Sequence, residues 1–363
     1  MVPLCLPDLC HNFHPVGALS PFDVRADSTA VSVCAPGRLH LGFLDPSGTL
    51  GRRFGSLGLM IDGFETELDI QFASADVWAA DGRAAEAELD RAAACIALLR
   101  RRTGLHTPLA LRLHRVLPAH AGFGSGTQLA LALGRGFARL HELDVPTAQL
   151  AHWLGRGQRS GIGIAGFDEG GLLVDGGPSA SGVPAPLLAR VAMPSDWRVV
   201  VVLDTRLEGL SGVPERQAIA NLAPLAQAQA ADICHRVVMQ VLPGAVTADF
   251  AAFAAGINRV QDLLGEHFAP AQGGSAWTSP AVGRLMGWMR GTSGTSGGAG
   301  HVDTVAIGQS SWGPTGFAIL PSADAAQQRV DAARQAGVVE AGLEVHVVGC
   351  RNQGAAISSN PSS

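Results

Sequence analysis

The chain has 363 residues and a formal net charge of −5, with 47% hydrophobic and 16% charged residues. This composition is typical of a globular protein with a substantial core, and the length allows two domains or one large one. The charge and the absence of a long basic run argue against nucleic-acid binding. No uninterrupted apolar stretch is long enough to cross a bilayer, which argues against a membrane protein.

The residue types present narrow the possible chemistry. All 26 residues counted as Lys or Arg are Arg, so a Lys base, a Schiff base and a Lys phosphate ligand are excluded. Any cation that holds an anion must therefore be Arg, His or a metal ion. The six Cys are scattered without a C-x-x-C pair, which argues against a zinc knuckle and a disulfide framework. The N-terminal residues lack the basic start of a signal peptide, so we expect a cytoplasmic protein.

Residues 1–28 are expected to form a disordered tail before a first domain over residues 29–190. Strands are predicted over "TAVSVCAPGRLHLGFL", with a tight turn at Pro36-Gly37, and over "SLGLMIDG" and "ETELDIQFAS". A helix that ends at Gly104 and a strand over "LALRLHRVLP" come next. A second, buried helix follows the glycine-rich segment after Pro118.

A change to Pro, Ser and Gly around residues 176–186 places a domain boundary near residue 190. The second domain, residues 191–350, begins with the buried strand "WRVVVVLD", and helices are expected at about 215–242, 246–264 and 280–290. It ends in the order strand, strand, helix, strand, which favours a ferredoxin-like sheet with helices on one face. Residues 351–363 are expected to be a loose tail.

The segment "LPAHAGFGSGTQLALALG" joins glycines and small hydroxyl residues to the start of an apolar helix. The first N–H groups of a helix are free and carry the positive end of its dipole, and glycines let a phosphate approach them. The alternative is a glycine-rich turn with Ser or Thr as the helix N-cap. The Lys of a Walker A loop is missing. The predicted phosphate-binding residues are Gly122, Gly124, Ser125, Gly126 and Thr127.

Three motifs resemble the GHMP kinase superfamily: "APGRLHLGF", "GFGSGT" after Pro118, and "RSGIGIAGF". Within it, "GFGSGTQLALALG", "SGIGIAGFDEGGLLVDGG" and "GQSSWGPTGFA" resemble the β-ribofuranosylaminobenzene 5′-phosphate synthase family of methanopterin biosynthesis. The resemblance implies an α+β fold with two domains, the first like ribosomal protein S5 and the second ferredoxin-like. It also implies a homodimer.

The chain departs from the kinases at the Ser-Gly-x-Asp motif, whose Asp serves in phosphoryl transfer in many of them. Gly163 occupies that position, and Asp168 lies five residues on. The resemblance instead implies transfer of ribose 5-phosphate from phosphoribosyl diphosphate to 4-aminobenzoate, with release of CO₂ and diphosphate. Mg²⁺ and backbone N–H groups would neutralise the departing diphosphate. An ATP-dependent small-molecule kinase, a non-catalytic ligand-binding protein and 4-hydroxybenzoate as the acceptor remain alternatives.

The candidate site residues come from the same motifs. Arg38, His40 and Arg159 are predicted to be catalytic, although a surface ion pair for Arg38 and a buried structural role for His40 are the alternatives. The predicted substrate-binding residues are Ser160, Ser310, Ser311 and Trp312, where Trp312 would stack on the benzoate ring or would simply be a core residue. The predicted Mg²⁺ ligands are Thr127 and Asp175, with Asp204, Glu208 and His301 as weaker site candidates.

Overall fold

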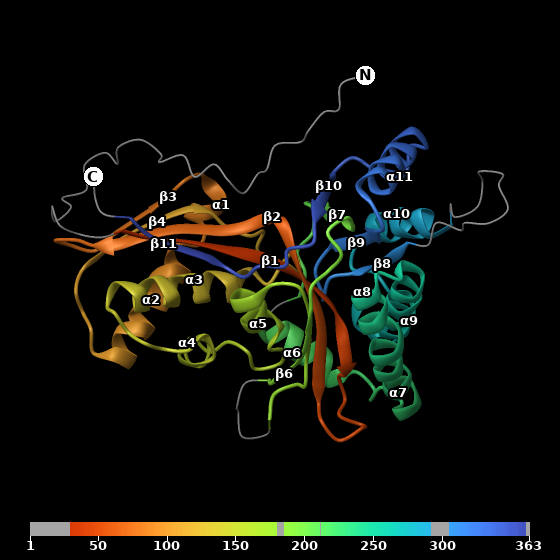
Figure 1. Cartoon of the computed structure of the whole chain (residues 1–363), viewed down its shortest axis with the longest axis horizontal. Coiled ribbons are helices and arrows are strands. Elements are labelled where there is room, and N and C mark those ends of the chain that lie inside the picture. The colour runs from red at the N-terminus through yellow and green to blue at the C-terminus, as the bar shows by residue number, and fades with distance from the viewer. Residues whose placement is uncertain (1–29, 180–184, 211, 292–304, 361–363) are drawn as a thin grey trace.

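The computed structural model describes residues 30–179, 185–210, 212–291 and 305–360. The predicted tail over residues 1–28 and the candidate His301 lie outside these ranges. Two β-sheets organise the chain, and helices pack against both (Figure 1). Within the described ranges, no helix is both long enough and apolar enough to span a membrane.

The first sheet is built on a long antiparallel hairpin of β1 (Ala30–Asp45) and β2 (Phe54–Phe72). The remaining strands along the chain are β3 (Val77–Ala80), β4 (Leu109–Arg115), β5 (Leu172–Asp175) and β6 (Leu187–Val191). β4 pairs with one end of β2, and β3 pairs with β4. β5 pairs with the other end of β2, and β6 pairs with β5. The hairpin therefore extends from the first domain toward the second sheet.

The turn predicted at Pro36-Gly37 does not form. β1 continues through both residues, and its register against β2 shifts between Pro36 and Arg38. A Cβ at Gly37 would lie 2.9 Å from Leu117 Cδ2, so the glycine permits close packing inside a bulged strand. The bulge matters because Arg38 follows it directly.

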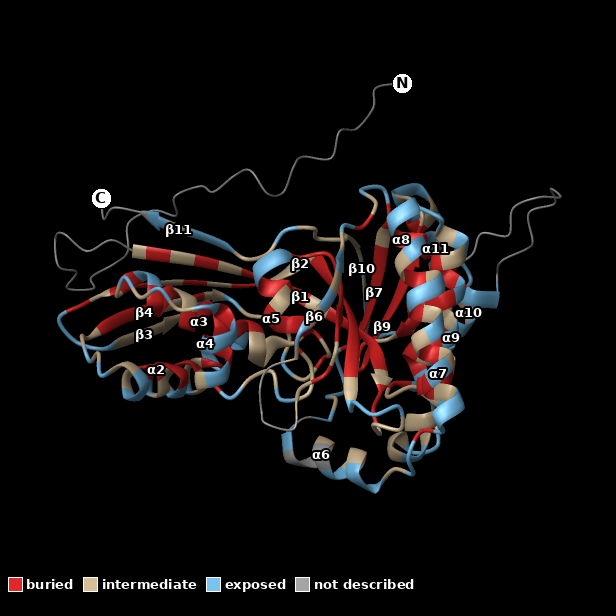
Figure 2. Cartoon of the chain, turned by 60° about the horizontal axis from the view of Figure 1, so that its bottom comes forward, coloured by how far each residue is buried: buried red, intermediate tan, exposed pale blue. Residues whose placement is uncertain are grey.

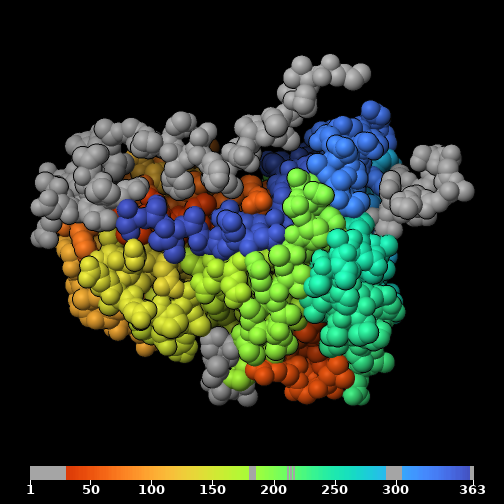
Figure 3. Space-filling view, in the orientation of Figure 1, coloured from red at the N-terminus to blue at the C-terminus, as the bar shows by residue number. Residues whose placement is uncertain are grey.

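The C-terminal segment also differs from the prediction. β11 (Ala356–Asn360) pairs antiparallel with β1 at the edge of the first sheet, so a loose tail over residues 351–363 is wrong as far as residue 360. Arg351 connects to the same sheet, since its N–H donates to the Met60 carbonyl at 2.9 Å. Figure 3 shows this dark-blue segment lying across the first domain. Pairing satisfies the free backbone groups of an edge strand, which a local sequence pattern does not reveal.

Helices of the first domain cover one face of its sheet (Figure 1). They are α2 (Leu89–Thr103), α3 (Ser125–Leu140), α4 (Thr147–Trp153) and α5 (Ile162–Glu169). The short α1 (Arg83–Glu86) lies apart from them, beside β3 and β4. α3 is the central one and is buried along most of its length (Figure 2). Its close approach to the sheet depends on Gly136, where a Cβ would lie 2.7 Å from Ile70. α3 is thereby fixed with its N-terminus toward the second domain.

The second sheet is antiparallel in the order β10 (Leu343–Gly349), β7 (Arg198–Asp204), β9 (Thr315–Leu320), β8 (Ala306–Gln309). Val200 and Val202 of β7 pack with α10 (Pro280–Gly291) and α11 (Ala323–Gln335). Val199 and Val201 belong instead to a core shared with the β1–β2 hairpin. The two sheets thus share one hydrophobic core. The strands change sheet between Val191 and Arg198, and the domain boundary at residue 190 stays a prediction.

The remaining helices lie between β7 and α10 along the chain. They are α6 (Gly212–Asn221), α7 (Gln227–Arg236), the π-helical η1 (Val237–Val241), α8 (Leu242–Thr247), α9 (Phe250–Phe268) and the 3₁₀ turn η2 (Ala269–Gln272). The single helix expected at about 215–242 is therefore interrupted by residues 222–226, where Pro224 lacks an N–H for a helical hydrogen bond.

Candidate active site

Three segments that the sequence analysis singled out meet between the sheets. They are residues 35–43, 118–127 and 308–318. Ser310 joins them, because its hydroxyl accepts a hydrogen bond from the His40 N–H at 2.9 Å and donates one to the Gly122 carbonyl at 2.8 Å. The backbone at Gly313 lies so close to Ala121 that no Cβ fits between them. Ser310 is thus a structural link at the centre of the site rather than a free substrate ligand.

α3 begins with free backbone N–H groups. Its N-cap is Gly124, at φ 74°, and no side chain caps the helix. The N–H groups of Thr127 and Gln128 donate to the Gly124 carbonyl at 2.9 and 3.1 Å. Those of Ser125 and Gly126 find no acceptor among the described residues. The alternative of a Ser or Thr N-cap is therefore wrong, and the first turn of α3 presents donors and a positive dipole to a ligand.

Arg38 lies over this turn with its charge unpaired. A Cβ at Gly124 would be 3.1 Å from Arg38 Nε, and Arg38 Nη1 donates to the Gly122 carbonyl at 3.3 Å. Nε is buried without an acceptor, and no carboxylate of the described chain forms an ion pair with this guanidinium. Burial lowers the pKa of Arg38 to about 10, while the charges of Glu215 and Asp175 act in the opposite direction. A buried cation without a partner favours an anionic ligand.

The loop between α4 and α5 brings two further arginines to α3. Arg159 forms an ion pair with Glu215 of α6 through two contacts of 2.6 and 2.7 Å. The Arg156 guanidinium lies over Gly126, where Nη1 would be 3.4 Å from a Cβ. Arg159 was predicted from the sequence, whereas Arg156 and Glu215 were missed. The segment "GRGQRSG" held one signal for Arg156, because glycines on both sides of it predict a tight loop.

Asp175 organises this loop instead of presenting oxygen atoms to a metal. Its Oδ2 accepts hydrogen bonds from Ser160 Oγ at 3.1 Å and Gly161 N at 2.8 Å, and its Oδ1 accepts one from Gly177 N at 2.8 Å. Burial raises the pKa of Asp175, and these hydrogen bonds lower it. Asp175 as a metal ligand and Ser160 as a substrate ligand stay predictions, and their hydrogen bond to each other does not favour either role.

His40 is a neutral group two residues after Arg38, on the same face of β1. Its side chain is buried, and its Nε2 has no hydrogen-bond partner in the described chain. Burial and the nearby charges of Arg38 and Arg159 lower the pKa of His40 well below its ordinary value. The imidazole therefore stays uncharged at neutral pH. Its ring contacts Phe43 edge to face, at 4.6 Å between centroids.

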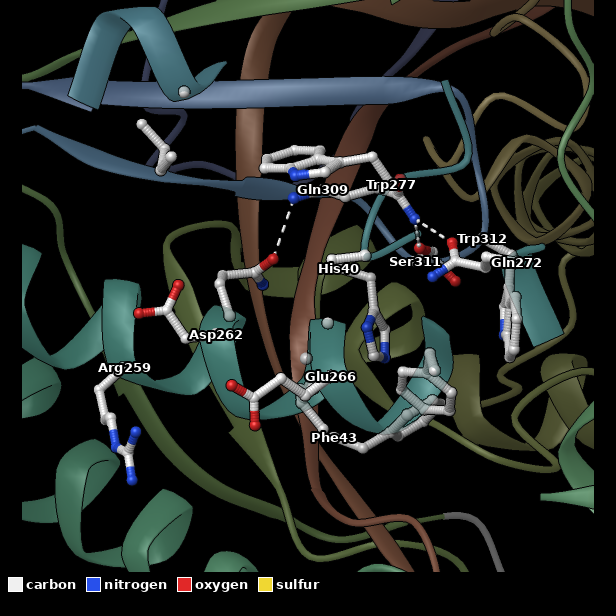
Figure 4. A pocket seen from close by; sticks show the side chains of 18 of the residues that line it. His40, Phe43, Arg259, Asp262, Glu266, Gln272, Trp277, Gln309, Ser311 and Trp312 are labelled. Atoms are coloured by element: carbon white, nitrogen blue, oxygen red, sulfur yellow. Dashed lines mark hydrogen bonds between the residues drawn. The ribbon is translucent and has the colours of Figure 1, made fainter. Parts of the chain in front are cut away.

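His40 borders a cavity of about 380 Å³ between β1, α9 and β8 (Figure 4). Aromatic side chains form much of its wall. They are Phe43, Phe268, Trp277 and Trp312. Trp312 is buried and lies 4.9 Å from Phe268 between ring centroids, and the neighbouring Ser311 has a positive φ of 56°. The predicted residues Ser311 and Trp312 thus line this cavity.

Several polar side chains of the cavity are engaged with the protein, although His40 Nε2 has no partner in the described chain and Glu266 is exposed. Gln261 donates to the Leu41 carbonyl at 2.7 Å and accepts from Gln309 N at 2.9 Å, and Gln309 donates to Gln272 Oε1 at 2.9 Å. The two arginines at its wall are each paired with a carboxylate: Arg259 with Asp232 and Arg290 with Asp262. The arginines that line the cavity are thus paired, unlike Arg38 at the start of α3, and its aromatic wall suits a flat ring.

The other predicted acidic residues do not form a metal site. Asp204 accepts hydrogen bonds from Arg206 Nε at 2.8 Å and from Ser279 Oγ at 2.7 Å, and the Arg206 guanidinium lowers the pKa of Asp204 to about 2. Asp204 is thus a structural residue, and Glu208 is exposed on the loop before α6. The described residues contain no group of three or more His, Cys, Asp or Glu side chains that could hold a metal.

Comparisons with known proteins identify relatives of the chain. Residues 90–171 match the family model of the GHMP kinases N terminal domain. The beta-ribofuranosylphenol 5′-phosphate synthase of Archaeoglobus fulgidus is 34% identical over 240 residues, which is 63% of this chain and 74% of that protein. The enzyme of the same name from Methanothermobacter thermautotrophicus is 32% identical over 243 residues, 62% of this chain and 74% of that protein.

A solved structure supports the fold over nearly the whole chain. The homoserine kinase of Cytophaga hutchinsonii superposes with a TM-score of 0.64 at 17% identity, covering 93% of this chain and 99% of that one. At this identity the likeness concerns the fold alone. It confirms the predicted α+β fold of the GHMP kinase type with two domains.

Proposed function

The chain belongs to the beta-ribofuranosylphenol 5′-phosphate synthase family, and from that premise we propose a decarboxylative ribosyl transfer. The donor is phosphoribosyl diphosphate, and the acceptor is a benzoate with an electron-donating para group. The products are an aryl riboside 5′-phosphate, CO₂ and diphosphate. We propose 4-aminobenzoate as the acceptor, with 4-hydroxybenzoate as the alternative that the name of the relatives favours.

One observation carries this proposal: the unpaired Arg38 lies beside the free N–H groups of α3. These cationic and dipolar groups fit a diphosphate. Gly163 occupies the position of the kinase aspartate and packs against Thr127. A Cβ added at Gly163 would lie 3.1 Å from the Thr127 methyl group. The chain therefore keeps an anion site of the superfamily without the carboxylate that serves phosphoryl transfer.

The proposed reaction needs positioning more than a protein base. The bond between ribose C1 and the diphosphate oxygen breaks, and its electrons leave with the diphosphate. The ring carbon that bears the carboxylate attacks C1, and the electrons of its bond to the carboxylate return to the ring as CO₂ leaves. Arg38 and the α3 N–H groups would stabilise the departing diphosphate. The cavity beside His40 would hold the aromatic ring within reach and exclude water.

The residues at the start of α3 could bind Mg²⁺ only if diphosphate oxygens supplied most of its ligands. Asp175 is engaged with backbone N–H groups, and the described chain offers no cluster of acidic or His ligands. The hydroxyls of Ser125 and Thr127 are the side-chain oxygens at the start of α3, so we propose that they face a Mg²⁺ carried by diphosphate oxygens. When bound, this ion would neutralise part of the charge of the leaving group.

The test is release of labelled CO₂. The purified protein is incubated with phosphoribosyl diphosphate, carboxyl-labelled 4-aminobenzoate and Mg²⁺, and each component is omitted in turn. The expected result is CO₂ release that requires all three, and parallel reactions with 4-hydroxybenzoate identify the acceptor. A folded protein that releases no CO₂ from either acid, or that consumes ATP to phosphorylate a small molecule, would contradict the proposal.

A further inference from the structure

The ribosyl donor of the proposed function is anionic at both ends, with a diphosphate at C1 and a phosphate at C5. The groups described so far account for one end only. We propose that Arg156, on the opposite side of the first turn of α3 from Arg38, binds the 5′-phosphate. This inference rests on the proposed function, but binding of the two halves of the donor can be measured separately.

The Arg156 guanidinium lies flat over the second residue of α3. Its Nη1, Cζ and Nη2 atoms would be 3.4, 3.8 and 3.9 Å from a Cβ at Gly126. Arg38 has the same relation to Gly124, where the distances to Nε and Cζ would be 3.1 and 3.4 Å. Gly124, with its φ of 74°, is therefore required beside Arg38, whereas a Cβ at Gly126 would only make ordinary van der Waals contact with Arg156.

The charge of Arg156 is uncompensated. Its Nε is buried without a hydrogen-bond partner, and no carboxylate of the described residues forms an ion pair with it. Arg100 is a useful contrast, because its Nε is also buried and unpartnered but its terminal nitrogens bind Asp76 at 2.6 and 2.7 Å. Arg159, in the same loop as Arg156, is neutralised by Glu215. Arg156 thus forms no ion pair in the described chain, and its neighbours there include the buried thiol of Cys95 on α2.

The loop holds Arg156 in place. Its N–H donates to the Ala151 carbonyl at 2.7 Å, and it is flanked by Gly155 at φ 67° and Gly157 at φ 81°. A Cβ at Gly157 would lie 2.6 Å from Ile164 Cδ1, so the loop packs tightly on α5. A guanidinium that is positioned before the ligand arrives loses less side-chain entropy on binding, and its planar fork matches a phosphate.

The experiment uses the full chain and two probes, ribose 5-phosphate and pyrophosphate with Mg²⁺, titrated by calorimetry. Arg156→Gln is expected to weaken binding of ribose 5-phosphate at least about tenfold and that of pyrophosphate less than about twofold. Arg156→Lys restores a charge without the fork and should recover part of the ribose 5-phosphate affinity. Arg101→Gln, an exposed position on α2, is the matched control and should change neither.

The outcomes separate the two proposals. Equal loss of both probes in Arg156→Gln, or unchanged binding of ribose 5-phosphate, overturns the role of Arg156 even if the wild type releases CO₂. If Arg156→Gln does not fold, Arg156→Lys decides the question, because unchanged affinity for both probes in this variant would contradict a bidentate phosphate contact. A wild-type protein that binds neither probe contradicts the proposed function itself.

Discussion

The start of α3 and the cavity beside His40 adjoin the same segment of β1 but differ in whether their arginines are paired with carboxylates. At α3, Arg38 and Arg156 keep buried nitrogen atoms without acceptors. In the cavity, Gln261 and Gln309 bond to each other and to the backbone, and both wall arginines are paired with aspartates. Polar groups that the protein leaves unsatisfied indicate the charge of a ligand, whereas satisfied groups indicate a wall.

Under the proposed function, this difference assigns one substrate to each region. An anion would compensate the cations at α3, which form no ion pair with the protein itself. A flat aromatic ring would fill the cavity without breaking its internal hydrogen bonds. Variants in each region test this division.

Arg38→Met should have the largest effect on function and little on folding. Removal of the charged donor is expected to weaken pyrophosphate binding by about ten- to a hundredfold, which corresponds to about 1.5–3 kcal/mol for hydrogen bonds to a charged group. Because the buried guanidinium lacks a carboxylate partner, the thermal midpoint should stay constant or rise. Calorimetric titration and thermal unfolding measure the two effects. A marked fall in the midpoint would show that Arg38 serves the fold instead.

Trp312→Leu should affect the other substrate. Loss of an aromatic contact in the cavity wall is expected to raise the KM for the aromatic acid about tenfold and to leave the KM for phosphoribosyl diphosphate unchanged. Steady-state kinetics with each substrate varied in turn provide the measurement. Trp78→Leu, on β3 in the first domain, serves as the control. Equal changes in both constants would break the division between the two regions.

Glu215→Gln should strengthen anion binding. Glu215 neutralises Arg159 in the unliganded protein, so an incoming diphosphate must compete with its carboxylate. Removing that charge is expected to lower the pyrophosphate Kd about two- to fivefold, a modest effect because the pair is partly exposed. Glu208→Gln on the exposed preceding loop is the control for a general change in charge. Weaker binding in Glu215→Gln would instead indicate that the carboxylate contacts the ligand through Mg²⁺.

The smallest effect concerns pH and a second histidine. His114 lies between Asp69 and Asp81, with both ring nitrogens at 2.8 Å from a carboxylate oxygen, and these hydrogen bonds raise its pKa. Because the pKa of His114 is higher in the folded than in the unfolded chain, its protonation stabilises the fold. This stabilisation is complete below pH about 6.5, the ordinary pKa of histidine, and is lost as the pH rises through the pKa of the folded state.

His114→Gln should therefore lower the thermal midpoint by about 1–3 °C at pH 6 and have no effect at pH 9. The measurement is thermal unfolding across this range, with the exposed His106→Gln as a control. His40 has the opposite sign, since its lowered pKa costs stability as the pH falls below about 6.5. If the thermal midpoints of His114→Gln and the wild type differ by the same amount at every pH, the prediction of a protonated His114 paired with Asp69 and Asp81 is refuted.

The sequence predicted the parts of the site that depend on neighbours in the chain. The glycine motif, the helix after it and the arginine of "APGRLHLGF" are local patterns, and they lie together in the structure as an anion site requires. The composition alone limited the cations to Arg, His or a metal. The bulge at Pro36-Gly37 was mistaken for a turn, because the same residue types serve both and only the contact with Leu117 distinguishes them.

Local sequence thus dictates a backbone that can receive an anion, since glycines and a helix start act through local conformation. The tertiary structure decided which charges remain for a ligand. Asp175 and Asp204 accept hydrogen bonds from the protein. Glu215, 56 positions after Arg159 in the chain, forms an ion pair with it, whereas Arg156 forms no ion pair in the described chain. A charge is free or neutralised according to its neighbours in space, and those neighbours come from segments that only the folded chain brings together.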